Sequence, residues 1–454
     1  MVLEQAAVLA RNVGPHERGA QQADEADGRL QRPQLIGDAL GALVMNINRV
    51  SLTNIRCFDE LEIQLDGRSA LIIGDNGDGK STVIRSLAMG LCDDSSAAAL
   101  FRDLHGETVQ KGYKSGRIEV TLRDRTGDFH TVTEIKSLKT FERVEQTLSH
   151  RSLRSKRRRK ISQMEFPWNR IFAAGYGAGI RVQGTADYDY YLTADAVYPL
   201  FRYDAPLQNP ELIVRRLVDA ARRNGQGGAH KILTYIKTLL RNLLQLDDQD
   251  QVELTRTGIT VRGRWGRSEL SSLGDGYRST VTWILDLLSW WFLRRSHARR
   301  SNGPVAIRGI VLIDEIEQHL HPRWQRNIMR LLTDAFPHVQ FIATTHSPLV
   351  ASGCEGIPVH RLAGGKSSVK HPFGWLAEDV YQMMGLPTSR AEELAERLST
   401  FEQLDLKRLR GQATGSDLAV LKKIRRRLDR MPQDDPVRLI SELKNLRKSL
   451  ESSG

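Results

Sequence analysis

The residues best suited to chemistry begin with a glycine-rich loop. Its sequence is Gly74-Asp75-Asn76-Gly77-Asp78-Gly79-Lys80-Ser81, followed by Thr82. The spacing G-x-x-x-x-G-K-[ST] is typical of a phosphate-binding loop, and here it follows an apolar run and precedes a helix expected to begin at Lys80. The glycines let consecutive backbone N–H groups point at a phosphate, and the positive end of the helix strengthens that field. We expect Lys80 to contact the β- and γ-phosphates of ATP and Ser81 to hold Mg²⁺.

A pair of carboxylates, Asp314 and Glu315, forms the second candidate. They follow four apolar residues, Ile310 to Ile313, a run typical of a central parallel strand that is buried on both faces. Two acids at the end of such a strand are costly unless a cation or a proton transfer compensates them. We expect Asp314 to bind Mg²⁺ and Glu315 to act as the general base that activates the attacking water.

Two shorter motifs complete the set. His346 lies in Thr344-Thr345-His346-Ser347-Pro348, at the end of the apolar run Val339 to Thr344, from which it would reach the γ-phosphate and the attacking water. Gly274-Asp275-Gly276 opens a helix and offers a second anion site. One nucleotide needs only one phosphate cradle, so a second cradle indicates use by a partner subunit. The alternative interpretation is a glycine turn that caps a helix.

In chain order, the four motifs resemble those of an ATP-binding-cassette-type head of the SMC and RecF-like group, over about residues 45 to 390. In that group they correspond to the Walker A loop, the signature, the Walker B strand and the switch histidine. Asn54-Ile55-Arg56-Cys57-Phe58 is similar to the group's first-strand turn, which implies that Asn54 and Arg56 lie near the nucleotide. The resemblance also implies two heads that enclose two ATP·Mg²⁺ between the loop of one head and the signature of the other.

Three further points of this resemblance concern single positions. Gly274 occupies the place of the usual signature serine, so backbone N–H groups would serve there instead of a hydroxyl. The glutamine of the group's Q-loop has one candidate, Gln183. The segment Glu317 to Gln325 is similar to the part of these ATPases where the dimer interface forms.

A biological role is implied by a second resemblance only. The compact head, the run Ala174-Gly175-Tyr176-Gly177, the segment Met384 to Arg390 and a charged helical tail resemble stand-alone bacterial ATPases of the AAA family. Several of these act in anti-phage defence with a nuclease encoded alongside, as in Septu-like systems. The resemblance implies a cytoplasmic ATPase subunit that controls a partner nuclease. The alternatives are a RecF-like DNA-repair ATPase that clamps DNA and the nucleotide-binding subunit of a membrane transporter.

The first three motifs must be positioned by strands of one sheet, because ligands of open α/β sheets bind at the carboxyl ends of the strands. Apolar runs place these strands at Ala70 to Ile73, Gly309 to Ile313 and Val339 to Thr344. We therefore predict an α/β fold of the P-loop NTPase class, with a mostly parallel mixed sheet flanked by helices.

Other parts of the chain surround this sheet. A helical lobe over about residues 205–300 would present the signature, and residues 391–454 would form a charged helical segment. Residues 1–44 are rich in Ala, Gly, Gln and Asp and are expected to be a disordered extension, or sequence upstream of a start at Met45. The polar, basic stretch from Lys139 to Gln163 is expected to be loose.

The net charge of +12 is concentrated in clusters of basic residues, including Arg154 to Lys160 and Lys422 to Arg427. Such clusters attract polyanions, above all nucleic acid, so DNA contact through these two is one interpretation and a solvated surface is the other. The 3 cysteines are isolated in the sequence, which fits a reducing cytosol. No run approaches the roughly 18–20 apolar residues that a membrane-spanning helix needs.

Overall fold

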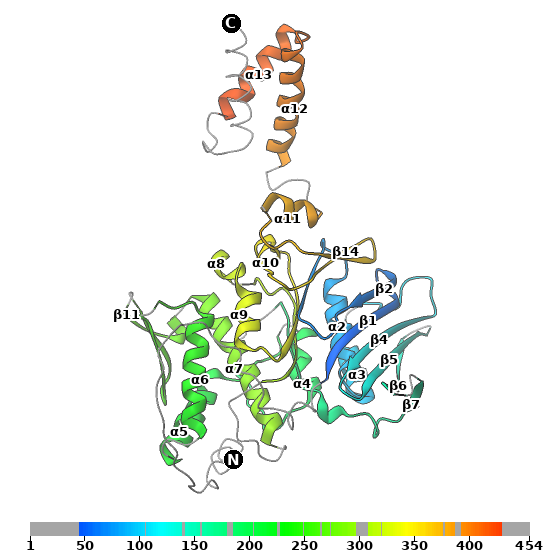
Figure 1. Cartoon of the computed structure of the whole chain (residues 1–454), viewed down its shortest axis with the longest axis vertical. Coiled ribbons are helices and arrows are strands. Elements are labelled where there is room, and N and C mark those ends of the chain that lie inside the picture. The colour runs from blue at the N-terminus through cyan, green and yellow to red at the C-terminus, as the bar shows by residue number, and fades with distance from the viewer. Residues whose placement is uncertain are drawn as a thin grey trace. The chain divides into compact units, whose positions relative to one another are not determined.

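The computed structural model of the chain (Figure 1) describes residues 45–104, 106–138, 141–154, 157–178, 185–202, 204–224, 228–247, 249–263, 266–272, 274–296, 307–318, 320–375, 377–385 and 392–428. The predicted extension over residues 1–44 and the candidate Gln183 lie outside these residues. The chain divides into two compact units between Val380 and Tyr381. All four motifs therefore belong to the first unit.

A six-stranded sheet carries the glycine-rich loop and the two carboxylates. Its strand order is β15-β14-β3-β13-β12-β8, with bounds β3 (Ala70–Ile73), β8 (Ala173–Tyr176), β12 (Gly309–Ile313), β13 (Val339–Thr344), β14 (Val359–Ala363) and β15 (Lys366–Lys370). All neighbouring pairs are parallel except β14 and β15. β3, β12 and β13 are buried along their whole length, as in a sheet covered on both faces. The predicted mixed sheet is confirmed, and the three predicted strands have the predicted bounds.

A second six-stranded sheet is antiparallel throughout. Its order is β2-β1-β4-β5-β6-β7, with bounds β1 (Asn46–Ile55), β2 (Phe58–Gln64), β4 (Ser115–Arg123), β5 (Gly127–Ser137), β6 (Glu142–Ser152) and β7 (Arg158–Ile161). The prediction of a loose stretch from Lys139 to Gln163 is wrong, because β6 and β7 occupy most of it. Leu148 and Ile161 are buried and stand opposite each other in the two strands. These apolar positions are few among charged residues, because one face of the sheet is solvated.

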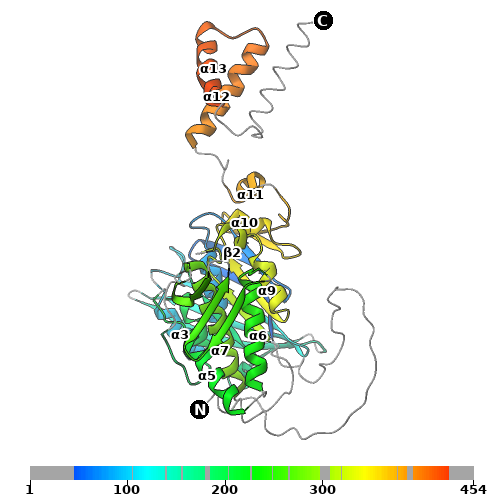
Figure 2. The same cartoon turned by 90° about the vertical axis from the view of Figure 1, so that its left-hand side faces the viewer.

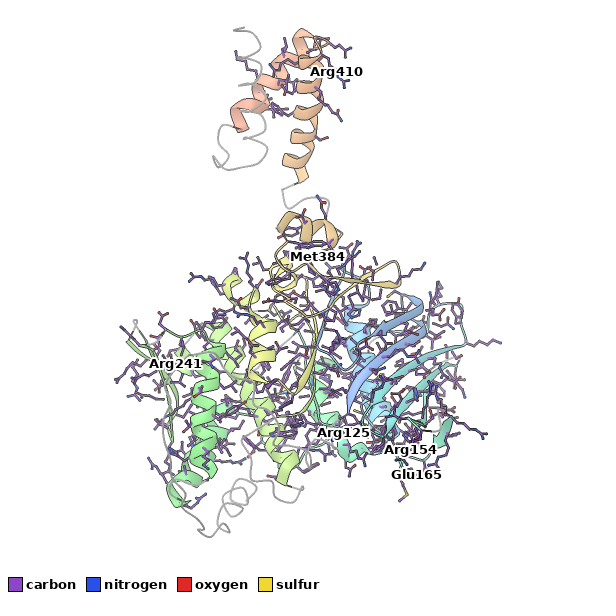
Figure 3. The ribbon with its side chains drawn as sticks, in the orientation of Figure 1. Arg125, Arg154, Glu165, Arg241, Met384 and Arg410 are labelled. Atoms are coloured by element: carbon purple, nitrogen blue, oxygen red, sulfur yellow. The ribbon has the colours of Figure 1, made fainter. Side chains whose placement is uncertain are left out.

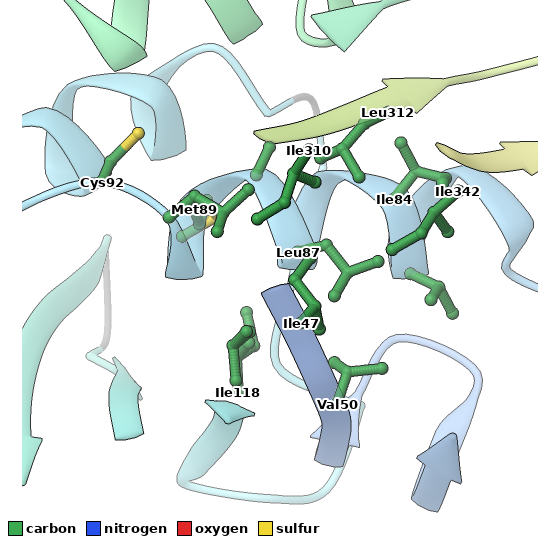
Figure 4. Close-up of a cluster of buried hydrophobic side chains, with 14 of the residues drawn as sticks. Ile47, Val50, Ile84, Leu87, Met89, Cys92, Ile118, Ile310, Leu312 and Ile342 are labelled. Carbon is green, nitrogen blue, oxygen red and sulfur yellow. The ribbon is translucent and has the colours of Figure 1, made fainter. Parts of the chain in front are cut away.

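Helix α2 (Lys80–Gly90) lies between the two sheets (Figure 4). Its buried side chains belong to one cluster that draws on all three elements: Ile84 and Leu87 of α2, Ile47, Val50 and Ile118 of the antiparallel sheet, and Ile310, Leu312 and Ile342 of the parallel sheet. The helix ends in close contact with β4, since a Cβ at Gly90 would lie 2.3 Å from Cγ2 of Val120. Burial on both sides of α2 stabilises the position of the loop that precedes it.

The bounds of the remaining helices of the first unit are α3 (Asp94–Arg102), α4 (Thr193–Val197), α5 (Pro210–Asn224), α6 (Gly228–Leu243), α7 (Asp275–Ser296), α8 (Pro322–Gln325), α9 (Ile328–Ala335) and α10 (Pro348–Ser352), and α11 (Ala377–Met383) spans the division between the units. Among these helices, α3 contacts β6 of the antiparallel sheet, α4, α7 and α9 contact strands of the parallel sheet, and α5 and α6 belong to the helical lobe (Figure 2). In the lobe, α5 contacts α6, α7 and the small sheet of β9 (Gln251–Thr255), β10 (Gly258–Gly263) and β11 (Gly266–Glu269). The long helix α7 begins beside Gly274 and reaches β8 of the parallel sheet.

The second unit contains a helical hairpin. Helices α12 (Glu392–Leu409) and α13 (Gly415–Leu428) contact each other, and Phe401 and Leu421 are buried. The carboxylate of Asp417 accepts the Thr414 N–H at 2.9 Å and so caps the start of α13. Across both units, none of the helices in the described part of the chain has the length and apolar content to cross a bilayer.

One buried side chain joins the two large sheets directly. The amide oxygen of Gln340, in β13, accepts the backbone N–H of Ile47 at 2.7 Å, and its nitrogen donates to the carbonyls of Ile47 and Arg68, both at 2.9 Å. Gln340 is 3% exposed, so water cannot easily replace these bonds when the amide is removed. The Gln340 side chain therefore fixes β1 relative to β13, the strand that leads to His346.

We expect Gln340→Ala to lower the free energy of unfolding by about 2–4 kcal/mol, because two buried backbone groups of Ile47 and the part-buried carbonyl of Arg68 lose their partner. Urea unfolding followed by circular dichroism measures this change. The control is Gln64→Ala, because Gln64 is exposed and its amide donates to Asp66 at 2.7 Å. Equal unfolding midpoints for the two variants would contradict the role of Gln340.

Candidate nucleotide-binding site

The glycine-rich loop has the geometry of an anion cradle. Gly77 and Gly79 have φ of +92° and +85°, in the left-handed region that glycine adopts without strain. A Cβ at Gly79 would also lie 2.4 Å from Cζ of Phe58. Gly79 is the residue before α2, and no side chain caps the helix there. The first backbone N–H groups of α2 therefore have no side-chain acceptor and suit a bound anion.

Lys80 is the cation of this loop. Its ammonium donates to the carbonyls of Gly74 and Asp75, at 2.9 and 2.8 Å, and the residue is 6% exposed. Burial lowers the pKa of Lys80 below its usual value, and nearby carboxylates, including Asp314 and Glu315, oppose that shift. The Lys80 ammonium thus lies within electrostatic range of the two acids that follow β12.

The hydroxyl of Thr344 holds both predicted acids in place. It donates to Oδ1 of Asp314 at 2.6 Å and accepts the backbone N–H of Glu315 at 2.8 Å. Glu315 has a φ of +55°, an uncommon conformation for a residue with a side chain. The backbone N–H of Asp314 donates to the carbonyl of Tyr176 at 2.8 Å. The two neighbouring strands, β13 and β8, therefore fix the end of β12 from both sides.

The residues predicted for Mg²⁺ fit that ion. Mg²⁺ takes oxygen ligands, and commonly only one or two carboxylates from the protein, while phosphates and water supply the rest. The Ser81 hydroxyl and the Asp314 carboxylate, which belongs to a residue that is 2% exposed, are oxygen ligands of that kind. Among the described residues, no group of three or more His, Cys, Asp or Glu side chains is arranged to hold a metal, so a protein-only metal centre of that type is not present there.

The loop that carries His346 is braced by a carboxylate that the sequence analysis did not single out as a site residue. Glu317 accepts the backbone N–H of His346 at 2.7 Å and the hydroxyl of Thr345 at 2.6 Å. The N–H of Thr345 donates to the carbonyl of Ile72, in β3, at 3.1 Å. His346 is thus held where β13 ends, beside the strand that leads into the glycine-rich loop. Glu317 could have been suspected because it follows Glu315 by two residues, but its partners lie far along the chain.

The predicted first-strand turn lies under the loop. Asn54 and Arg56 have φ of +53° and +50°, and Phe58 forms the wall against which Gly79 packs. The N–H of Arg56 donates to the carbonyl of Thr108 at 2.8 Å. Burial, followed by the nearby Arg85 charge, lowers the pKa of Arg56 below its usual value. The turn therefore supports the cradle through Cys57 and Phe58, which lie against Gly79.

The predicted signature is at the start of α7, on the lobe. Gly274 and Asp275 are exposed, and the N–H groups of Tyr277 and Arg278 donate to the Gly274 carbonyl. The ring of Tyr277 packs edge-on against Trp324 of α8, with 4.5 Å between ring centres. These contacts join the helix start to the segment that follows the Walker B acids and leave its first residues on the surface.

Two segments of the chain that contribute residues to this site match known protein families. Residues 210–352 match a family model described as "AAA domain, putative AbiEii toxin, Type IV TA system", and residues 49–172 match one described as "AAA domain". The two matches contain all four motifs. Over these two regions the chain therefore contains the sequence features of an AAA-type P-loop ATPase domain.

Several individual proteins are similar to this chain. It is 26% identical over 312 residues to the Septu protein PtuA of Bacillus mycoides (strain KBAB4), covering 67% of this chain and 38% of the relative. It is 31% identical over 171 residues to the "Retron Vc95 probable ATPase" of Vibrio cholerae, covering 35% of this chain and 33% of the relative. A solved SMC head domain from Thermotoga maritima matches with a TM-score of 0.39 and 16% identity, covering 72% of this chain and 98% of that one. The matched regions span 38% and 33% of the length of these two curated relatives.

We expect Thr344→Val to slow ATP hydrolysis by about 10- to 100-fold, because the acids of the Walker B strand lose their shared hydroxyl partner. Phosphate release at saturating ATP and Mg²⁺ measures the change. Thr333→Val is the matched control, since the Thr333 hydroxyl donates to Met329 of its own helix at 3.0 Å. Hydrolysis by Thr344→Val at the wild-type rate would show that this hydroxyl does not position the acids.

Proposed function

We propose that this chain binds ATP with Mg²⁺, hydrolyses it, and dimerises around it. The observation that carries the proposal is the buried Lys80 of the glycine-rich loop at the edge of the sheet where β12 leads into Asp314 and Glu315. These groups come from distant segments and lie within electrostatic range of one another. A buried site of this charge pattern suits phosphoryl transfer, where positioning and electrostatic stabilisation supply most of the catalysis.

Each residue has a defined task in this proposal. Lys80 exchanges the carbonyls of Gly74 and Asp75 for oxygens of the β- and γ-phosphates. Ser81 and Asp314 hold Mg²⁺, which when bound neutralises charge that develops on the phosphates. Glu315 accepts a proton from the attacking water.

Other residues complete the nucleotide site. His346 contacts the γ-phosphate, and Asn54 and Arg56 line the flank of the nucleotide. The backbone of Asn76 to Gly79, with Thr82, surrounds the phosphates.

The second half of the site comes from another copy of the chain. Gly274, Asp275 and Gly276 lie at an exposed helix start, where backbone N–H groups favour an anion. The segment Glu317 to Gln325 packs beside them through Trp324 and Tyr277. Two heads in a C2 arrangement would each present this surface to the P-loop of the other.

The biological role we propose is that of a cytoplasmic ATPase subunit in a bacterial anti-phage system, which controls a partner nuclease. Similarity to the Septu protein PtuA and to a retron ATPase supports it, and the support is by analogy with those proteins. A RecF-like ATPase that clamps DNA is the second candidate. A nuclease that co-purifies from the native host would favour the first role over the second.

Direct DNA contact would use the clusters Arg154 to Lys160 and Lys422 to Arg427. Arg154 lies at the β6–β7 end of the antiparallel sheet, near Glu165 (Figure 3). Two members of the first cluster already have partners, because Arg158 pairs with Glu119 at 3.0 Å and Arg159 with Glu165 at 3.2 Å. DNA would therefore compete with these carboxylates, and DNA-stimulated hydrolysis should fall steeply with salt.

Two substitutions separate binding from hydrolysis. Lys80→Ala should abolish binding of ATP, because the phosphates lose their cation. Glu315→Gln should keep binding, slow hydrolysis by at least about 100-fold, and accumulate an ATP-bound dimer on size-exclusion chromatography with light scattering. Glu355→Gln, at an exposed turn, is the control and should behave as the wild type. Wild-type turnover by Glu315→Gln would exclude Glu315 as the base.

A further inference from the structure

A buried hydrogen bond joins helix α7 to the parallel sheet. The hydroxyl of Tyr176, the last residue of β8, donates to Oδ2 of Asp286 at 2.9 Å. Asp286 lies in the middle of α7 and is 1% exposed, and Tyr176 is 0% exposed. The ring of Trp283, one turn earlier on the same face of α7, packs on the Tyr176 ring with 5.4 Å between centres. Helix α7 thus holds Tyr176 by its ring and by its hydroxyl.

Tyr176 is also a neighbour of the Walker B strand. It pairs with Ile313 in the parallel register of β8 and β12, and its carbonyl accepts the backbone N–H of Asp314 at 2.8 Å. The side chain of Tyr176 therefore points to the helical lobe while its backbone supports the residue proposed to hold Mg²⁺. One residue therefore contacts both helix α7 and the backbone of Asp314.

The carboxyl of Asp286 is costly in this place. Its other oxygen accepts the Gln208 N–H at 2.8 Å, and the indole of Trp290 also donates to it. Despite these three donors, burial raises the pKa of Asp286 to about 7. An apolar residue of similar size would usually stabilise a packed helix as well or better. A carboxyl at this buried position therefore indicates that Asp286 has a role other than stabilising the fold.

We propose that Asp286 and Tyr176 are positioning residues that set the geometry of Asp314 according to the placement of α7. The proposal rests on the proposed function, since it concerns how that ATP site is assembled. Helix α7 begins at the signature, so contact of Gly274 to Gly276 with a second head acts on the same rigid element that holds Tyr176. Displacing α7 must either break a fully buried hydrogen bond or move the end of β8 with it. Closure of the dimer is in this way linked, within one chain, to the position of Asp314, the proposed Mg²⁺ ligand.

The test separates metal-dependent from metal-independent binding. Affinity for a fluorescent ATP analogue is measured in EDTA and then across a Mg²⁺ titration. For Tyr176→Phe and Asp286→Leu we expect binding in EDTA to match the wild type, because the P-loop is intact. The Mg²⁺ concentration for half-maximal enhancement should rise on the order of tenfold. Asp286→Asn, which keeps the shape and can still bond Tyr176, should restore a near wild-type Mg²⁺ response.

The controls cover misfolding and additivity. Thr282→Val is the matched variant, because Thr282 is a buried α7 residue whose hydroxyl donates to Arg278 of the same helix at 2.8 Å. If thermal melting shows that Asp286→Leu is unfolded, Tyr176→Phe alone decides the question, since it removes one hydroxyl. The double variant Tyr176→Phe/Asp286→Leu should show no further loss, because both changes break one contact.

The outcomes distinguish this inference from the proposed function. A wild-type Mg²⁺ response in folded Tyr176→Phe, with nucleotide binding abolished by Lys80→Ala, would overturn the positioning role and leave the ATP site intact. Equal weakening in EDTA and in Mg²⁺ would also overturn it, since that result indicates a general structural effect. Absence of nucleotide binding by the wild type would remove the proposed function itself.

Discussion

The burial of one ammonium and one carboxylate at the same edge of the parallel sheet is the constraint on which the rest of the site depends. Lys80 is 6% exposed and Asp314 is 2% exposed, and charges so far from water are costly unless they are paired and hydrogen-bonded. The fold meets this requirement with backbone carbonyls for the ammonium and with Thr344 and Tyr176 for the acids. The helix between the two sheets, the left-handed glycines and the parallel strand order all serve to keep these groups together.

Local signals predicted the centre of the structure well. Strands β3, β12 and β13 and the start of α2 could be read from apolar runs and glycine spacing, because burial on both faces of a sheet leaves an uninterrupted apolar sequence. The stretch containing β6 and β7 was predicted wrongly, because only a few of its apolar residues, such as Leu148 and Ile161, meet the core. The strand order of either large sheet could not be predicted, since it depends on pairing between distant segments.

The residues that support the site could not be predicted from the sequence, for a related reason. Thr344 and Glu317 act through partners on other strands, and no local pattern reveals those partners. Asp286 gave one usable signal, because a carboxylate inside the apolar helical run Val281 to Leu293 needs a hydrogen-bond donor from elsewhere. The identity of that donor, Tyr176, appears only in three dimensions. The family matches end at residue 352, before the second unit, so they bear on the nucleotide chemistry and not on the partner.

The central claim is that the P-loop and the Walker B acids form one site for ATP and Mg²⁺. An experimental structure of this chain with Mg²⁺ and a slowly hydrolysed ATP analogue tests it most directly. The account predicts that the Lys80 ammonium leaves the carbonyls of Gly74 and Asp75 for phosphate oxygens, with the metal between Ser81 and Asp314. A nucleotide bound elsewhere, or a Lys80 that keeps both carbonyls while the nucleotide is bound, would contradict it.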